Sequence, residues 1–134
     1  MATEHNILKA IGATPLVELR RVVPSGHARI VVKMEGANPT GNMKDRMAKS
    51  AIEAAEADGR LRPGGTIVEY TGGSTGASLA LVCAAKGYRL KIVTSDAFSE
   101  EKTRTTQAFG AEIISIPSEG KKITETLIRT MIPR

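Results

Sequence analysis

The sequence has no tryptophan, only 3% of its 134 residues are aromatic, and cysteine occurs once. So few aromatic side chains leave little on which the bases of a single-stranded nucleic acid could stack. The lone cysteine, Cys83, excludes a disulfide within the chain, and its almost wholly apolar surroundings predict a buried, unreactive thiol. His5 and His27 have no partner at metal-ligand spacing, so we interpret both as surface residues and expect no metal site.

Long hydrophobic runs are also missing, and none reaches membrane-spanning length. The first residues lack the basic start and apolar core of a signal peptide, so we expect a cytoplasmic protein with no membrane contact. The net charge of +5 would permit binding to polyanions, yet the basic residues are spread along the chain. A nucleic-acid-binding function would rest on that charge alone, and we expect no nucleic-acid partner.

What is present is a regular alternation of strand-like and helix-like segments, with 41% hydrophobic residues, enough for one modest domain with a core. Before the alternation, the pattern predicts a helical turn over 7–11, an extended segment over 13–19 and a strand over 28–34. Later strands are expected over 66–69, 90–94 and 112–116, and helices over 74–86, 99–109 and about 123–131. Ser99 is the expected N-cap of the second of these helices. This alternation predicts an α/β fold, an open parallel sheet with helices on both faces.

The stretch from Asn38 to Ala48 places a lysine where a turn meets an amphipathic helix. The turn residues come directly before an apolar pattern at helical spacing, so Lys44 is expected in the first turn of the helix. The helical pattern ends near Gly59, which is the expected C-terminal cap. The positive end of the helix dipole disfavours a cation there and favours the neutral amine that Schiff-base chemistry requires. The alternative is that Lys44, Asp45 and Arg46 form an ordinary solvated charge cluster.

A second candidate site is the glycine-rich stretch from Glu69 to Ala77, which joins a predicted strand to a predicted helix. Such a junction exposes backbone amides and the positive end of a helix to an anion. The glycines allow close approach of a ligand, and the loop's hydroxyl groups can donate hydrogen bonds. The alternative is a tight turn with no ligand.

Together the two stretches resemble the fold-type II pyridoxal phosphate enzymes, specifically the cysteine synthase and cystathionine beta-synthase family. The lysine stretch is similar to the family's Asn-Pro-x-x-Ser-x-Lys-Asp-Arg pattern, with Asn42 where serine is common. The resemblance implies that Lys44 is catalytic and binds pyridoxal phosphate covalently. The loop is similar to Glu-Pro-Thr-Ser-Gly-Asn-Thr-Gly, but has Tyr70 for proline, Gly72 for serine and Ser74 for asparagine. It implies that Ser74 contacts the cofactor and that the substrate binds to Thr71, Gly72, Gly73, Ser74 and Thr75.

The resemblance also implies a tryptophan synthase beta subunit-like fold, truncated. Residues 1–134 would be a single N-terminal smaller domain with its N-terminal arm, and most of the large C-terminal domain, with the loop for the cofactor phosphate, would be absent. The implied reaction is that of a cysteine synthase, in which O-acetylserine and sulfide give cysteine and acetate, in a homodimeric full-length parent. Without the phosphate loop we expect weak cofactor binding and little turnover by this chain.

Two alternatives stay open. The chain could belong to a related enzyme, such as a cystathionine beta-synthase or a serine/threonine dehydratase. It could also be a non-catalytic truncated paralogue that docks on a full-length partner.

Overall fold

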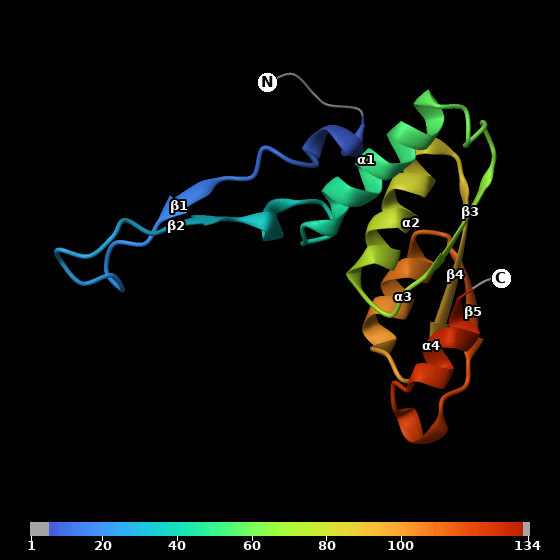
Figure 1. The fold of residues 1–134 in the computed structure, drawn as a ribbon. Helices are drawn as coiled ribbons and strands as arrows, with labels where there is room; N and C mark the ends of the chain where they lie inside the picture. Colours follow the sequence, from blue (N-terminus) through green and yellow to red (C-terminus); the bar gives the residue numbers. More distant parts are fainter. Residues whose placement is uncertain (1–5, 133–134) are drawn as a thin grey trace.

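The computed structural model describes residues 6–132 and consists of a helix-and-sheet body from which a long hairpin projects (Figure 1). The helices are α1 (Lys44–Ala57), α2 (Ser74–Lys86), α3 (Glu100–Ala108) and α4 (Glu125–Met131), with 3-10 helices η1 (Ile7–Ala10), η2 (Glu35–Ala37) and η3 (Glu119–Lys121). The strands are β1 (Leu16–Glu18), β2 (Val31–Lys33), β3 (Thr66–Tyr70), β4 (Arg89–Ser95) and β5 (Glu112–Ile116). His5 lies outside the described residues.

The body is organised around a three-stranded sheet in the order β3-β4-β5, and both neighbouring pairs are parallel. Its central strand, β4, is the most buried, and Ile92 pairs with Glu69 on one side and Ile113 on the other. Each strand is followed by a helix, and two of these helices connect parallel neighbours. The predicted α/β fold with an open parallel sheet is therefore confirmed.

Helices cover both faces of this sheet, as the sequence predicts. On one face, the nearly apolar helix α2 packs against Leu90 and Ile92 of β4 and against α1 and α3. On the other face, Leu127 and Met131 of α4 pack against Val93. Side chains alternate across a strand, so the even-numbered residues of β4 meet α2 and Val93 meets α4. Within residues 6–132, no helix combines the length and apolar character needed to cross a membrane.

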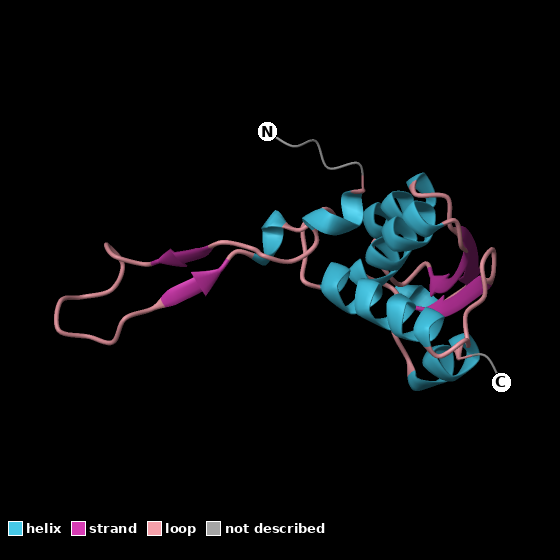
Figure 2. Cartoon of the chain, turned by 90° about the horizontal axis from the view of Figure 1, so that it is seen from above, coloured by secondary structure: helices cyan, strands magenta, loops and turns pink. Residues whose placement is uncertain are grey.

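The projecting segment is a separate antiparallel hairpin in which β1 pairs with β2, Val17 opposite Val32 (Figure 2). The strand predicted over 28–34 is thus present but shorter, and it pairs with the predicted extended segment. Apolar side chains of both strands, including Leu16 and Val31, are exposed. An isolated two-stranded ribbon has no covered face, and such ribbons are marginally stable in water.

The ends of the helices follow the sequence signals with two differences. Helix α1 ends at Ala57, and Gly59 has the positive φ of 77° that favours glycine. Ser99 occupies the N-cap position of α3, as expected, although its side chain makes no capping hydrogen bond. Helix α4 begins only at Glu125, because Thr124 is extended and its hydroxyl accepts the Leu127 N–H at 3.2 Å.

Candidate functional site

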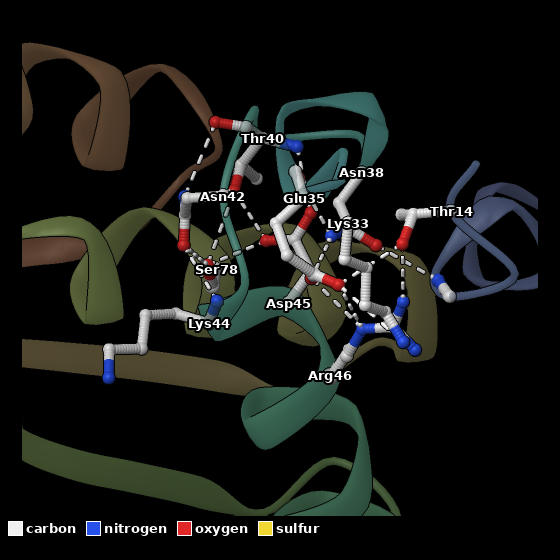
Figure 3. A network of polar contacts seen from close by, with 11 residues as sticks. Thr14, Lys33, Glu35, Asn38, Thr40, Asn42, Lys44, Asp45, Arg46 and Ser78 are labelled. Atoms are coloured by element: carbon white, nitrogen blue, oxygen red, sulfur yellow. Dashed lines mark hydrogen bonds and ion pairs between the residues drawn. The ribbon is translucent and has the colours of Figure 1, made fainter. Parts of the chain in front are cut away.

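Lys44 is the first residue of α1, as predicted. Its backbone N–H donates to the Asn42 side-chain oxygen at 2.8 Å, so the helix start is closed by the residue two positions earlier. The side chain is half-buried and extends away from the polar network around it (Figure 3). Among residues 6–132, Nζ of Lys44 has no hydrogen-bond or ion-pair partner. The amine is therefore available to a ligand.

Asp45, the next residue, is fully buried with 0% of its surface exposed. The backbone N–H of Thr40 donates to Oδ2 of Asp45 at 2.8 Å, and the Ser78 hydroxyl donates to Oδ1 at 2.6 Å. The Thr40 hydroxyl also donates to Oδ1. A negative charge in the first turn of a helix is stabilised by the helix dipole. The alternative of a solvated cluster at residues 44–46 is therefore wrong for Asp45.

Arg46 ties the helix to the segment that precedes it (Figure 3). Its Nε donates to the Glu35 carboxylate at 3.0 Å, and its Nη2 donates to the Thr14 hydroxyl at 2.9 Å. Asn38 donates to the same carboxylate at 2.8 Å and accepts the Gly12 N–H at 2.9 Å. The hydrogen bond from Arg46, followed by that from Asn38, lowers the pKa of Glu35 from 4.5 to about 2. This charged cluster fixes the root of the hairpin on α1.

The predicted substrate loop lies where β3 ends and α2 begins. The Thr71 N–H donates to the Val93 carbonyl at 3.0 Å, and the Thr71 hydroxyl accepts the Gly73 N–H at 3.3 Å. Helix α2 starts at Ser74, so the first amides of a 13-residue helix point out of its end at this loop. Burial raises the pKa of Glu69, the carboxyl group just before the loop. The arrangement has the donors that an anion requires.

The structure leaves no room for a side chain at Gly72. A Cβ atom added to it would lie 2.0 Å from Cγ of Phe98, well inside the contact distance of two carbon atoms. The Phe98 ring is itself held, since its backbone N–H donates to the Ser95 carbonyl at 3.1 Å and its side chain packs beside Val93. The Phe98 ring therefore occupies the volume that a side chain at position 72 would need.

The two candidate sites are joined through α2. A hollow of about 420 Å³ is lined by residues of the loop and of α4, and Lys44 is not among them. Its lining comprises Glu69, Tyr70, Thr71, Gly72, Thr75, Phe98, Ile123, Ile128 and Met131. Gly73 lines a separate small cavity behind the loop, beside Thr94, whose buried hydroxyl has no hydrogen-bond partner in the described part of the chain. The link between the sites is Ser78, on α2, which contacts Asp45.

Three residues of the site were not predicted as functional: Asp45, Ser78 and Phe98. Ser78 carries a signal, because it is a single hydroxyl within an otherwise apolar stretch of helix, and such a group needs a buried partner. Phe98 carries none, since its contact with Gly72 depends on how β4 and α3 are placed in space. Cys83 is 2% exposed, and burial raises the pKa of its thiol to about 11, as its predicted inertness requires.

The parallel sheet, the lysine at a helix start and the glycine-rich strand-to-helix loop are the features expected of a fold-type II pyridoxal phosphate enzyme. Residues 7–131 match the family described as pyridoxal-phosphate dependent enzyme, and the chain belongs to that family.

Among curated relatives, the cysteine synthase of Staphylococcus aureus is 48% identical over 118 residues, which cover 87% of this chain and 38% of that enzyme. The O-ureido-L-serine synthase of Streptomyces lavendulae is 45% identical, covering 84% of this chain and 35% of that enzyme. A crystal structure of O-ureido-L-serine synthase has a TM-score of 0.82 at 44% identity, covering 87% of this chain and 36% of that one. A hydrogen sulfide-producing enzyme from Fusobacterium nucleatum has a TM-score of 0.84 at 35% identity, covering 98% and 42%. The chain thus spans well under half the length of these relatives.

The residues present fit pyridoxal phosphate in two respects. The Lys44 amine has no partner in the described part of the chain, and a free primary amine is the group that condenses with an aldehyde. The start of α2 offers amide donors and the Ser74 side chain, which suit an anionic or hydroxylated ligand. When bound, the cofactor supplies an electron sink for chemistry at the α carbon of an amino acid.

Proposed function

We propose that this chain is the lysine-bearing part of a cysteine synthase-like enzyme. The reaction would replace the acetate group of O-acetylserine by sulfide, giving cysteine and acetate. One observation carries the proposal: the amine of the half-buried residue Lys44 lies without a partner, within the described residues, at a helix start that Asp45 and Ser78 join to α2. The match to cysteine synthases over 87% of the chain supports it.

In this proposal the side chains divide the work. Lys44 would hold the cofactor covalently until the amino group of the substrate displaces it. The freed Nζ of Lys44 would then take the proton from the substrate's α carbon. Ser74 donates a hydrogen bond to the cofactor. The substrate carboxylate binds to the segment Thr71, Gly72, Gly73, Ser74 and Thr75, through its hydroxyl groups and those amides that make no hydrogen bond within the protein, helped by the positive end of α2. The substrate is a small amino acid, and a homodimer is the assembly we propose for the full-length parent.

The experiment adds pyridoxal phosphate to the purified chain, reduces with borohydride and locates the pyridoxyl group by peptide mass. We expect the label at Lys44, and its loss in Lys44→Arg, which keeps the charge but cannot form the Schiff base. Label scattered over the other lysines at the same level would contradict the proposal. Their labelling in the same sample is the internal control for exposed amines.

Turnover then separates the related reactions. Product analysis with sulfide, with homocysteine and with no added nucleophile distinguishes a cysteine synthase from a cystathionine beta-synthase or a dehydratase. The likeness to O-ureido-L-serine synthase adds another activated serine to the substrates to be offered. Cysteine formed from O-acetylserine faster than any other product would support the proposal, and preference for another pair would replace it.

A second candidate, a non-catalytic chain that docks on a full-length relative, is favoured by the hairpin. Leu16, Val17 and Val31 are exposed on a two-stranded ribbon that projects from the body. Copurification with a longer pyridoxal phosphate enzyme, lost on replacing Leu16 and Val17 by serine, would support this candidate. A chain that is labelled at Lys44 and turns over substrate without such a partner would dismiss it.

A further inference from the structure

The Asp45 carboxylate receives hydrogen bonds from two different parts of the chain. Thr40 donates to it through both its N–H, at 2.8 Å, and its hydroxyl, and belongs to the turn that leads to Lys44. Ser78 donates at 2.6 Å and belongs to α2. Both hydroxyl groups reach the same oxygen, Oδ1, and the two hydroxyl oxygens lie 3.2 Å apart. One buried atom thus joins the turn to α2.

These residues lie next to the two candidate sites. Asp45 follows Lys44 directly, and Ser78 lies four residues after Ser74, one helical turn below the start of α2. The side-chain oxygen of Asn42 accepts the Lys44 N–H at 2.8 Å and lies 3.5 Å from the Ser78 hydroxyl. Three contacts at Ser78, with Thr40, Asn42 and Asp45, therefore connect residues 40–46 to α2.

We propose that Thr40, Asp45 and Ser78 are positioning residues that hold the start of α1 in fixed register with the start of α2. This inference rests on the proposed function, because the register it fixes is that of Lys44 with the substrate loop. A lysine has four flexible side-chain bonds, so its amine is placed reproducibly only where its backbone is held. Reacting groups need placement within about 0.5 Å, which a hydrogen-bonded carboxylate shared by both elements provides.

The test compares variants that remove one hydroxyl each. Thr40→Val removes the hydroxyl group at nearly constant volume, and Thr40→Ser keeps it. Ser78→Ala removes the hydroxyl on α2. Cys83→Ala is the matched control, because it truncates a buried side chain of the same helix five residues further on, outside the network. All variants are compared at a temperature at which each is folded.

Amide hydrogen exchange is measured without pyridoxal phosphate. In Thr40→Val we expect exchange to rise about fivefold or more at Gly73 and Gly76, whose N–H groups donate to the Thr71 hydroxyl and the Gly73 carbonyl, as well as in its own turn. Thr40→Ser and Cys83→Ala should leave Gly73 and Gly76 as in the unsubstituted chain. A rise confined to residues 40–46 would overturn the inference, because the turn would then be a local structure only.

Labelling by pyridoxal phosphate and borohydride gives the second readout. The fraction of label at Lys44 should fall about fivefold or more in Ser78→Ala and stay unchanged in Cys83→Ala. Equal labelling of Lys44 in these two variants would count against positioning by Ser78. Absence of Lys44 label in the unsubstituted chain would instead count against the proposed function. The exchange experiment contains no cofactor, so the two failures are distinguishable.

Discussion

The lysine turn, residues 40–46, and the glycine-rich loop, residues 71–76, are held in opposite ways. In the turn, polar side chains make the structure: three hydrogen bonds converge on the buried Asp45 carboxylate. In the loop, the close packing depends on the absence of side chains. A Cβ at Gly72 would overlap Phe98, and one at Gly76 would lie 3.1 Å from the Thr71 methyl group. We therefore expect the turn to be destabilised when a polar group is removed, and the loop to be destabilised when a side chain is added.

Asp45→Ala should have the largest effect. It leaves the Thr40 N–H and two hydroxyl groups without their acceptor in a buried site, and each unsatisfied donor costs about 1–3 kcal/mol. We expect a loss of about 3 kcal/mol or more in the free energy of unfolding, measured by urea denaturation. Glu53→Ala, at an exposed position of the same helix, is the control and should change stability by less than about 0.5 kcal/mol. Equal effects of the two variants would refute the distinction drawn for the turn.

Gly72→Ser tests the opposite rule by adding a side chain to the loop. The added Cβ overlaps the Phe98 ring, and overpacking of this kind costs about 1–3 kcal/mol. In the Phe98→Ala background the serine has room, so its cost should largely disappear, giving a coupling free energy of about 1 kcal/mol or more. Thermal unfolding of the four proteins of this cycle measures it. Additive effects would mean that Phe98 does not restrict position 72.

This comparison explains what the sequence could predict. Periodicity placed the helices and parallel strands, and the turn chemistry before Lys44 placed it in the first turn of α1, because both signals are local. The pairing of β1 with β2 was not predicted, since 12 residues separate them, and the turn that the sequence predicts over residues 23–26 lies within a connection too long for a tight hairpin. The contact of Asp45 with Ser78, 33 residues later, and that of Gly72 with Phe98 depend on tertiary packing.

The resemblance to known motifs, by contrast, reached the candidate residues directly. It marked Gly72 and Ser74 as departures without a physical reason. The structure gives the reason for Gly72, in the ring of Phe98. The roles of Lys44 and of Thr71 to Thr75 in binding stay predictions, as does the division into a smaller and a larger domain. Substrate chemistry depends on groups brought together in space, which spacing along one chain does not determine.

The ion pair between Glu35 and Arg46, beside the turn, predicts a dependence of stability on pH. The pKa of Glu35 in the folded protein, about 2, lies below its ordinary value of 4.5, so its contribution to stability is complete above about pH 4.5. That contribution is lost as the pH falls from there towards about 2. We expect the midpoint of thermal unfolding to drop over this interval. Glu35→Gln and Arg46→Leu should each flatten the drop, and an unchanged pH profile in both would contradict the assignment.

The smallest effects on stability are expected at the N-caps of α3 and α4. The Thr124 hydroxyl accepts the Leu127 N–H, whereas Ser99, at the equivalent position of α3, makes no side-chain capping bond. Thr124→Ala should cost about 1 kcal/mol, because one amide of α4 loses its acceptor. Ser99→Ala should cost less than about 0.5 kcal/mol, as at a surface position without such a bond. Urea denaturation of both variants measures the difference. A larger loss at Ser99 than at Thr124 would show that the residue type, rather than the hydrogen bond formed, sets the strength of a cap.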